Sequence, residues 1–319
     1  MGHCFYCGLN FAGHSFTARE MMFGARDEFE YAQCPGCHSC ILLTPLDSFD
    51  LSNYYPRDYY SFNQEKPESN SLQSFLRRRR GQHLFGRPNF VGAIMSWLKP
   101  MRYTLLSEYS GLSIESSVLD VGSGNGVFLS MLAENGFLNL HGCDPYIDQP
   151  IRADKINIYK CAIEDMTGPY QFIFFNHSFE HLPNPDQSLR ATRSLQTAGS
   201  ACIIRTPTTS SLAFERYGAN WVQLDPPRHI SVPSREGMRA LAHSSGYRLE
   251  RMIDDSGAFQ FWGSEQYVKD IPLTSDRSYY RNPTSSMFSE AEIARFELAS
   301  TEANNLNRGD QTAFVLRAA

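Results

Sequence analysis

The sequence predicts an α/β protein with a doubly wound parallel sheet, preceded by a small cysteine-rich module. Three observations carry this prediction. Two Cys-x2-Cys pairs lie near the start of the chain, strand-like and helix-like segments alternate from about residue 112 onward, and the first strand runs into the glycine-rich stretch Gly122–Gly126. With 319 residues, of which 42% are hydrophobic, the chain can build one full core and a smaller module.

The N-terminal cysteines predict a structural zinc site. Eight cysteines are too few for a disulfide scaffold in 319 residues, and five of them precede residue 41. Cys4 and Cys7 form one chelating pair, Cys34 and Cys37 another, and the 26 residues between the pairs suit a zinc ribbon. Four protein ligands leave no position for water or substrate, which is typical of structural zinc. A redox role is the alternative. Alternative ligands are His3, His38 and Cys40.

A connector and a helical segment follow the cysteine pairs. The connector is rich in aromatic residues, namely Tyr54, Tyr55, Tyr59, Tyr60 and Phe62. Apolar spacing from about residue 72 to 111 predicts two or three helices. Arg77–Arg80 would form a solvated helix face or, alternatively, contact a phosphate-bearing substrate or partner. We therefore divide the chain into a zinc-ribbon module over 1–48, a connector and helical segment over 49–111, and a larger domain over 112–319.

The larger domain begins with a strand over 117–121 and a helix over 127–135. Further strands are expected at 138–143, 156–159, 170–176, 201–206, 247–254 and 312–317, and further helices at 186–197, 234–245 and 289–305. Seven strands that alternate with helices in this way predict a parallel sheet with right-handed crossovers, the last two strands forming an antiparallel edge.

The glycines between the first strand and its helix predict a ligand site. Gly122, Gly124 and Gly126 let the backbone turn sharply and approach a ligand without interference from Cβ atoms. The following helix presents free amides that favour a carboxylate or phosphate. Asp144 follows the second strand, 22 residues after Gly122, where a carboxylate can accept hydrogen bonds from ribose hydroxyls. Together these features predict a nucleoside-containing ligand.

The run from Val118 to Gly126 resembles the first motif of class I S-adenosylmethionine-dependent methyltransferases. Its spacing is G-x-G-x-G, and Val127 stands where dinucleotide-binding folds carry their third glycine. The resemblance implies a Rossmann-like methyltransferase domain over 112–319 and adenosylmethionine as cofactor. Residues implied for its methionine part are Asp120, Gly122, Ser123, Gly124 and Gly126. Asp144 would hold the ribose, and Glu164 and Asp165 the adenine.

The strand over 170–176 runs into a polar turn that contains His177, Glu180 and His181. This turn resembles the fourth motif of a methyltransferase subgroup with a Glu-His-Leu-x-x-Pro tail, and the whole resemblance covers about 110 to 250. The paired cysteines and the tyrosines also resemble sugar-modifying methyltransferases. The larger sugar C-methyltransferases have an additional C-terminal domain, which we do not expect in these 319 residues.

Methylation of a hydroxyl or an acidic C–H requires removal of a proton, a task that suits a neutral imidazole near pH 7. His177 is the first candidate base because it directly follows a strand whose end should face the ligand. A structural role is the alternative. We expect His181 to orient the loop with Glu180 as a helix cap. A divalent ion held by His177, Glu180 and His181 is a further interpretation.

The long segment over 206–233 is expected to form a lid over the acceptor pocket, since long loops in compact domains are usually functional. It contains His229, the second candidate base, and Arg228, which could pair with a phosphate or carboxylate of the substrate. Prolines and aromatic residues that pack a rigid lid are the structural alternative. We assign the helical region between about 255 and 311 to the acceptor side.

Charge and hydropathy limit the partners. The net charge of −5 and a pI near 6.0 argue against a nucleic acid or an anionic membrane as partner. No apolar run approaches the roughly 20 residues that cross a bilayer, and the first residues lack the pattern of a secretory leader. We therefore expect a cytoplasmic methyltransferase of a small polar acceptor, such as a sugar or nucleotide-sugar. Alternatives are O-methylation of a phenolic or quinone-like compound, and a non-catalytic ribbon protein that binds nucleic acid or a partner.

Overall fold

The computed structural model describes residues 2–11, 15–55, 71–99, 101 and 103–319. Tyr59, Tyr60 and Phe62 of the expected connector lie outside these residues. The chain forms two compact units. Unit 1 comprises Met1–Pro56, His177–Arg190 and Ile204–Leu316. Unit 2 comprises Arg57–Asn176, Ala191–Ile203 and Arg317–Ala319. The division into 1–48, 49–111 and 112–319 stays a prediction.

The predicted α/β fold is confirmed by a sheet of eight strands in the order β13-β14-β11-β10-β6-β7-β9-β8. The strands are β6 (Ser117–Val121), β7 (Asn139–Cys143), β8 (Ile151–Ala153), β9 (Ile156–Tyr159), β10 (Phe172–Asn176), β11 (Ala201–Pro207), β13 (Tyr247–Asp254) and β14 (Gln311–Ala318). β10, β6, β7 and β9 are parallel neighbours. Apart from Asp120, their buried side chains are apolar, as is typical of parallel strands covered on both faces.

The sheet has one strand more than the seven predicted. β8 runs antiparallel to β9, with Ile151 opposite Ile158. Its three residues contain a single large apolar side chain, and Arg152 and Ala153 are exposed. Such a short strand has no alternation that a sequence pattern could detect, whereas each of the seven predicted strands is present.

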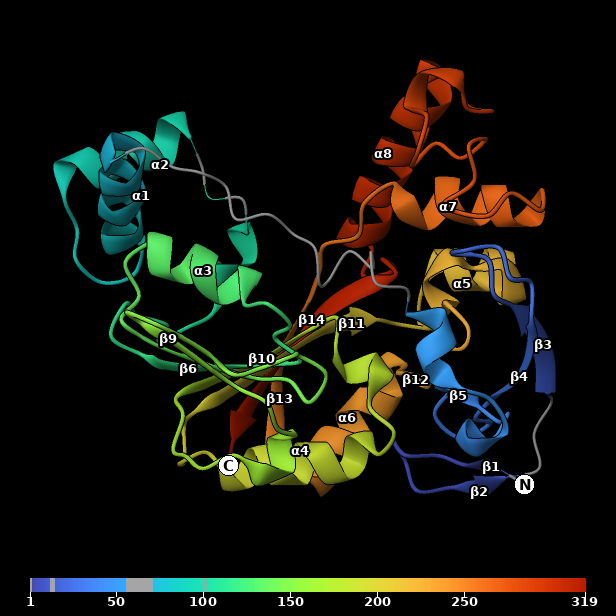
Figure 1. Ribbon diagram of the computed structural model, residues 1–319, viewed down its shortest axis with the longest axis horizontal. Helices are drawn as coiled ribbons and strands as arrows, with labels where there is room; N and C mark the ends of the chain where they lie inside the picture. Colours follow the sequence, from blue (N-terminus) through green and yellow to red (C-terminus); the bar gives the residue numbers. More distant parts are fainter. Residues whose placement is uncertain (1, 12–14, 56–70, 100, 102) are drawn as a thin grey trace. The chain divides into compact units, whose positions relative to one another are not determined.

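In unit 2, α1 (Ser71–Leu84) packs against α2 (Phe90–Leu98), as Figure 1 shows. The two helices approach one another closely at Gly92, where a Cβ atom would lie 2.3 Å from the carbonyl oxygen of Arg79. The arginine run is not a uniformly solvated face. Arg77 forms an ion pair with Glu134 at 2.6 Å, and Arg80 is buried and donates to Asn135 Oδ1 at 3.0 Å. These two arginines therefore stabilise the packing of α1.

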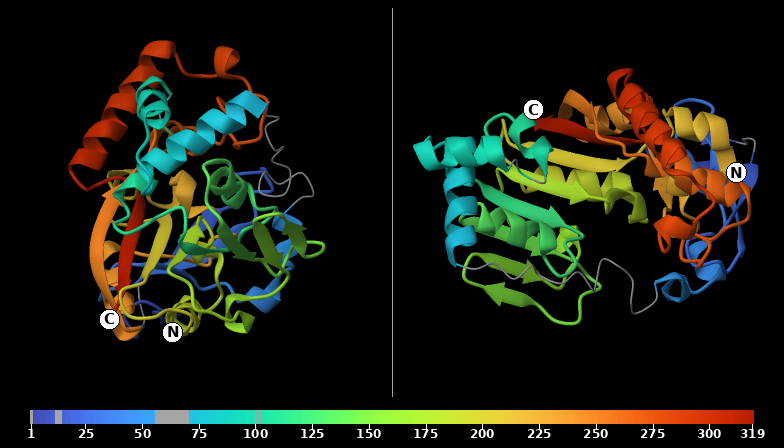
Figure 2. Two further views of the ribbon diagram at one scale, coloured as in Figure 1. Left: turned by 90° about the vertical axis from the view of Figure 1, so that its left-hand side faces the viewer. Right: turned by 90° about the horizontal axis from the view of Figure 1, so that it is seen from above.

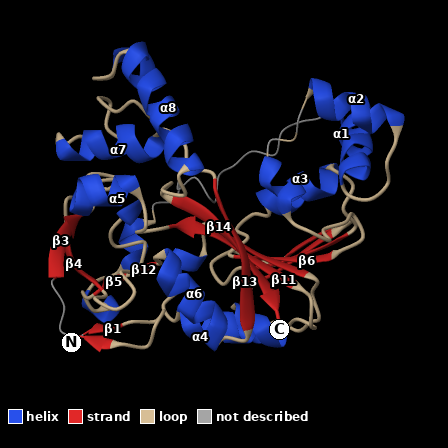
Figure 3. Ribbon diagram, turned by 180° about the vertical axis from the view of Figure 1, so that it is seen from behind, coloured by secondary structure: helices blue, strands red, loops and turns tan. Residues whose placement is uncertain are grey.

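In unit 1, the N-terminal module forms a sheet in the order β12-β5-β4-β3, together with the separate pair β1 and β2 (Figure 3). The strands are β1 (Gly2–His3), β2 (Asn10–Phe11), β3 (Ser15–Arg19), β4 (Glu28–Gln33), β5 (Cys40–Leu42) and β12 (Ser231–Val232). β12 belongs to the expected lid, and it places Val232 opposite Cys40 of β5. Tyr31 and Leu42 share one buried core with Trp221. The ribbon and the lid segment are therefore one packed structure.

The remaining helices are α3 (Val127–Glu134), α4 (Pro185–Ser194), α5 (Leu212–Tyr217), α6 (Arg235–Ser244), α7 (Phe259–Val268) and α8 (Glu290–Asn305). α7 and α8 pack side by side at the orange and red end of the chain, with Phe261 stacked on Phe296 at 6.2 Å between ring centroids (Figure 2). A capping box between Ser289 and Glu292 starts α8. Among the helices described here, none combines the length and the apolar character that a membrane span requires.

Candidate active site

The glycine loop of unit 2 joins β6 to α3. Gly122, Gly124 and Gly126 have φ values of 72°, 50° and 76°, a left-handed conformation that favours glycine. A Cβ atom on Gly126 would lie 2.5 Å from Cδ1 of Ile158. The amide of Gly122 donates to the carbonyl oxygen of Cys143 at 2.9 Å, which holds the loop against the end of β7. The glycines are therefore required by both backbone conformation and space.

Asp144 lies directly beside this loop. Its Oδ2 accepts a hydrogen bond from the amide of Gly124 at 2.9 Å, and its Oδ1 accepts one from the amide of Tyr146 at 2.8 Å. Each carboxylate oxygen has a further lone pair, so the carboxylate can also accept from the hydroxyls of a ligand. The structure thus brings together Gly124 and Asp144, which the sequence assigned to one site.

Asp120 is buried at the end of β6, where Asn176 and Tyr103 extend its polar surroundings. Nδ2 of Asn176 donates to Asp120 Oδ1 at 3.4 Å, and the hydroxyl of Tyr103 donates to Asn176 Oδ1 at 2.9 Å. Burial raises the pKa of Asp120 to about 8, the hydrogen bond from Asn176 opposes this shift, and the charge of Asp144 adds to it. Sequence reasoning missed Asn176 and Tyr103. A polar residue at the end of β10 was the available signal for Asn176.

Two further residues expected to contact the ligand lie after β9. Glu164 and Asp165 belong to a short 3₁₀ helix over Ile163–Asp165, and both are exposed. Ser123, in the loop itself, is buried, and among the residues described its Oγ has no hydrogen-bond partner. A buried hydroxyl without a partner indicates a group that a ligand would satisfy.

His177 opens the imidazole cluster of unit 1. Its φ of 52° is left-handed, which is uncommon for a residue with a side chain and occurs preferentially at functional sites. Nε2 lies 2.6 Å from Nη1 of Arg205, and Arg205 is held by Asp255 Oδ2 at 2.8 Å. Since arginine only donates, Nε2 accepts and the hydrogen of the neutral ring is on Nδ1. Nδ1 lies 3.4 Å from Glu180 Oε1.

Glu180 is the fully buried centre of the cluster. The hydroxyl of Thr206 donates to Oε2 at 2.9 Å, while Oε1 faces Nδ1 of His177 and lies 3.9 Å from Nε2 of His229. Burial alone would raise the pKa of Glu180, but the interactions with His177, His229 and His181 outweigh it and lower the pKa to about 2. Burial lowers the pKa of His181 to about 4, and the charge of His229 adds to this shift. The expected helix cap is thus a buried anion among imidazoles.

The expectation that Arg228 contacts substrate is wrong, because its side chain is fully buried and bound by protein groups. Nε and Nη2 donate to the two carboxylate oxygens of Asp225 at 2.8 and 2.5 Å, and Nη2 donates to Glu20 Oε1 at 2.8 Å. Burial alone would raise the pKa of Asp225, but the guanidinium outweighs it and lowers the pKa. Arg228 therefore stabilises the contact between the lid segment and β3.

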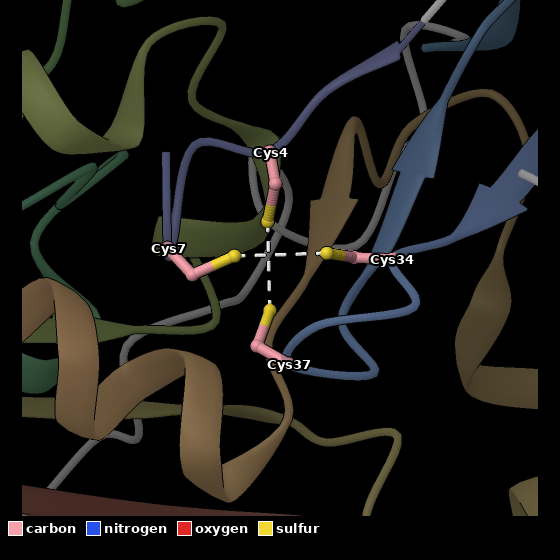
Figure 4. Close-up of side chains that lie close together, drawn as sticks. All are labelled: Cys4, Cys7, Cys34 and Cys37. Carbon is pink, nitrogen blue, oxygen red and sulfur yellow. Dashed lines mark hydrogen bonds between the residues drawn. The ribbon is translucent and has the colours of Figure 1, made fainter. Parts of the chain in front are cut away.

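The four cysteine sulfurs converge at one point, as Figure 4 shows. Cys4 Sγ lies 3.5 Å from Cys37 Sγ, and Cys7 Sγ lies 3.6 Å from Cys34 Sγ. The thiol hydrogen bond with Cys4 lowers the pKa of Cys37 to about 5. In the described part of the chain the four form one potential metal-binding group without His3, His38 or Cys40. Cys40 lies in β5 as a buried residue.

The two cysteine pairs have the same backbone. The amide of Gly8 donates to the carbonyl of Cys4 at 2.8 Å, and the amide of His38 donates to the carbonyl of Cys34 at the same distance. Gly8 and His38 are both left-handed, with φ values of 73° and 64°. The pairs are thus two matching turns that face one another.

A depression of about 730 Å³ also lies in unit 1, lined by Gln33 of the ribbon, Ser210 of the lid segment and Arg308, which follows α8. Arg308 forms an ion pair with Glu215, and neither the candidate bases nor the cysteines line this depression. Its position gives it no part in the chemistry of the site.

Comparison with protein families identifies the family of this chain. A family model described as "Methyltransferase domain" matches residues 76–251, more than half of the chain. The chain belongs to this methyltransferase family. With its α/β fold and glycine loop it is a class I S-adenosylmethionine-dependent methyltransferase, as the sequence predicts. Comparison with curated proteins finds no match.

Solved structures similar to this methyltransferase have low sequence identity to it. The cyclopropane synthase MmaA2 from Mycobacterium tuberculosis is 13% identical, with 79% of this chain and 100% of that chain covered and a TM-score of 0.43. Mycolic acid cyclopropane synthase CmaA1, complexed with SAH and CTAB, is 16% identical over 78% and 94% of the two chains, with a TM-score of 0.43. Geranyl diphosphate methyltransferase in complex with SAM is 10% identical over 80% and 93%, with a TM-score of 0.44.

The residues of unit 2 fit adenosylmethionine. The unpartnered Ser123 hydroxyl offers a hydrogen bond to a polar group of the ligand. Asp144 has acceptor capacity for ribose hydroxyls. Gly122 and Gly124 carry no Cβ atom that would obstruct a ligand close to the backbone. These groups of unit 2 are compatible with the polar parts of adenosylmethionine.

Proposed function

We propose that this methyltransferase transfers a methyl group to a sugar or nucleotide-sugar, with His177 as the general base. The observation that carries the proposal is the polar character of the side chains around His177. Arg205 and Asp255 are partly exposed, and Gln311 donates to Asp255 Oδ1 at 2.8 Å. Such donors and acceptors match a hydroxyl-rich acceptor, whereas a phenolic acceptor requires apolar walls.

Of the two candidate bases, His177 is the more accessible. Its side chain is 30% exposed, whereas that of His229 is 7% exposed. A dissolved acceptor reaches His177 without rearrangement of the lid, which favours it over His229. Uptake of a proton at Nε2 requires that the acceptor hydroxyl replace Arg205 at this atom, and Arg205 keeps Asp255 as partner.

Bound adenosylmethionine supplies an electrophilic methyl group, and Asp144 and the glycine loop would hold it. The protein then has to orient the acceptor and remove one proton. After proton uptake His177 is an imidazolium whose Nδ1–H faces the buried Glu180 carboxylate. The negative charge of this carboxylate, 3.4 Å away, stabilises the cation.

The cysteine cluster is proposed to hold one structural Zn²⁺. A tetrahedral site with Zn–S bonds of about 2.3 Å separates its sulfurs by roughly 3.8 Å, and the sulfur pairs at 3.5 and 3.6 Å are close to this value. Four cysteine ligands leave no open position, so the metal would stabilise the ribbon and take no part in methyl transfer.

The acceptor and the base are tested with isotopically labelled adenosylmethionine and a panel of sugars, nucleotide-sugars and phenols, with mass spectrometry as readout. We expect label only in sugar-containing products. His177→Gln should lower turnover by about a hundredfold or more, with adenosylmethionine affinity unchanged. His243→Gln, at an exposed position of α6, is the matched control.

Label found only in phenols would show that the acceptor is phenolic and would contradict the proposed sugar acceptor. Full turnover in His177→Gln combined with a loss in His229→Gln would transfer the role of base to His229.

A further inference from the structure

We propose that Glu180, His181 and His229 bind one divalent transition-metal cation, separately from the cysteine cluster. One carboxylate oxygen and one nitrogen of each ring lie within 4.8 Å of one another. Glu180 and His181 belong to a short 3₁₀ helix over Phe179–His181, and His229 precedes β12. The amide of Ile230 donates to the carbonyl of Glu180 at 2.8 Å, so the backbone holds the two segments together.

Both rings have the orientation of metal-binding histidines. Nδ1 of His229 lies 2.8 Å from the carbonyl oxygen of Gln223, and Nδ1 of His181 lies 2.8 Å from that of Arg228. A carbonyl oxygen only accepts, so the hydrogen of each neutral ring is on Nδ1 and Nε2 has a free lone pair. Metal-ligating histidines in proteins typically donate their second nitrogen to such an oxygen.

The third group is a buried carboxylate oxygen that lacks a donor. The Glu180 side chain is 0% exposed, and Oε1 accepts no hydrogen bond from the residues that the structure describes. Nδ1 of His177 at 3.4 Å approaches it without hydrogen-bond geometry, and Nε2 of His229 stays at 3.9 Å. A buried anionic oxygen in this state is costly, and a bound cation removes the cost.

The buried charges point the same way. Glu20, Asp225 and Glu180 are three carboxylates with at most 5% exposure, and Arg228 is a fully buried cation between the first two. Three negative charges and one positive charge leave a net charge of −2. Buried charge needs compensation, and one divalent cation supplies it.

The ligand set limits the chemistry. Two imidazoles and one carboxylate suit zinc, iron or manganese and leave coordination positions open for water or an acceptor hydroxyl. Metal–ligand bonds of about 2.1 Å would bring the ligand atoms within roughly 3.5 Å of one another. Side-chain rotations that move these atoms by about 1 Å would be enough to shorten the present distances, which are within 4.8 Å. A hydroxyl bound to the cation loses its proton more readily. This last role rests on the proposed function, whereas the site itself does not.

The test uses the full chain with zinc kept in the ribbon, and Mn²⁺ as the probe. Manganese prefers nitrogen and oxygen ligands over thiolates, so the cysteine cluster does not compete for it. Loss of the free-ion signal in electron paramagnetic resonance measures binding, and we expect one Mn²⁺ per chain. Glu180→Gln and His229→Gln should each weaken binding at least about tenfold. His243→Gln, which is exposed and outside the cluster, should leave it unchanged.

Pulsed resonance on the wild-type complex makes the test independent of the folding of any variant. Coupling to the nitrogens of two imidazoles is expected. Absence of Mn²⁺ binding, absence of nitrogen coupling, or unchanged affinity in a folded Glu180→Gln that still binds adenosylmethionine would each overturn the site. Labelled methyl transfer is scored separately: transfer that is equal with and without Mn²⁺ refutes only the catalytic role, and a metal-bound protein that labels no sugar refutes only the proposed function.

Discussion

Arg228 donates to Glu20 across 2.8 Å, and neither side chain is exposed although 208 residues separate the two in the chain. Glu20 directly follows β3, and its carboxylate also accepts from the amides of Phe23, Gly24 and Ala25 at 2.9 Å each. Arg228 stands in the lid segment next to His229. This buried ion pair therefore adds to the β12–β5 pairing between the ribbon and the segment that carries a candidate base.

Replacement of Arg228 by Met should destabilise the protein by about 3–5 kcal/mol, because it leaves Glu20 and Asp225 as buried charges without a cation. Thermal or urea unfolding measures the effect. The matched control is Arg190→Met, since Arg190 is 52% exposed and pairs with Asp186 at 2.5 Å, and exposed pairs contribute less than about 1 kcal/mol. Similar losses in the two variants would contradict a structural role for the buried pair.

Replacement of Asp144 by Ala should weaken adenosylmethionine binding by about tenfold or more, because it removes the hydrogen bond that holds Gly124 and the acceptor proposed for the ribose hydroxyls. Calorimetry measures the affinity. Asp148→Ala removes an exposed carboxylate from the same loop and should leave the affinity unchanged. An Asp144→Ala protein that binds the cofactor like wild type would remove this residue from the site.

Asp120 makes the stability of the cofactor-free protein depend on pH. Its pKa is raised from an ordinary 3.8 to about 8, so the folded protein binds a proton that the unfolded chain releases. The contribution of protonated Asp120 to the free energy of unfolding is complete below about pH 4. It declines as the pH rises and is lost above about pH 8. Asp120→Asn should match wild type near pH 4 and be more stable by about 5 kcal/mol at pH 9. Unfolding midpoints at several pH values, with the exposed Asp165→Asn as control, measure this difference; a gap that does not change with pH would contradict it.

The local features of the molecule were accessible from sequence because spacing alone specifies them. The left-handed glycines of the loop, the strand before them and Asp144 after the next strand all follow from patterns within 30 residues, and the fold they predict is confirmed. The cysteine pairs could be predicted equally well, since each chelating pair needs only one turn with two cysteines at the right spacing.

Polar contacts between residues far apart in the chain could not be predicted from sequence spacing. Arg228 has the same identity whether it faces a substrate phosphate or a buried carboxylate, and only the fold brings Glu20 to it. Likewise, the residues next to Glu180 in sequence predict a helix cap. Its actual contacts include Thr206 and His229, which belong to other elements of the fold. Charge pairing between distant segments leaves no periodic signal in the chain.

The two cysteine turns allow a matched test of zinc binding. Gly8 and His38 occupy equivalent left-handed positions, which cost a residue with a Cβ atom about 1 kcal/mol or more. No atom lies within 4 Å of a Cβ built on Gly8, so Gly8→Ala should weaken zinc retention through backbone strain alone, by about fivefold. His38→Gly should relieve the same strain and retain zinc as well as or better than wild type. Competition with a chelator measures both, and a loss of zinc in His38→Gly would mean that the imidazole, and not only the turn, contributes to the metal site.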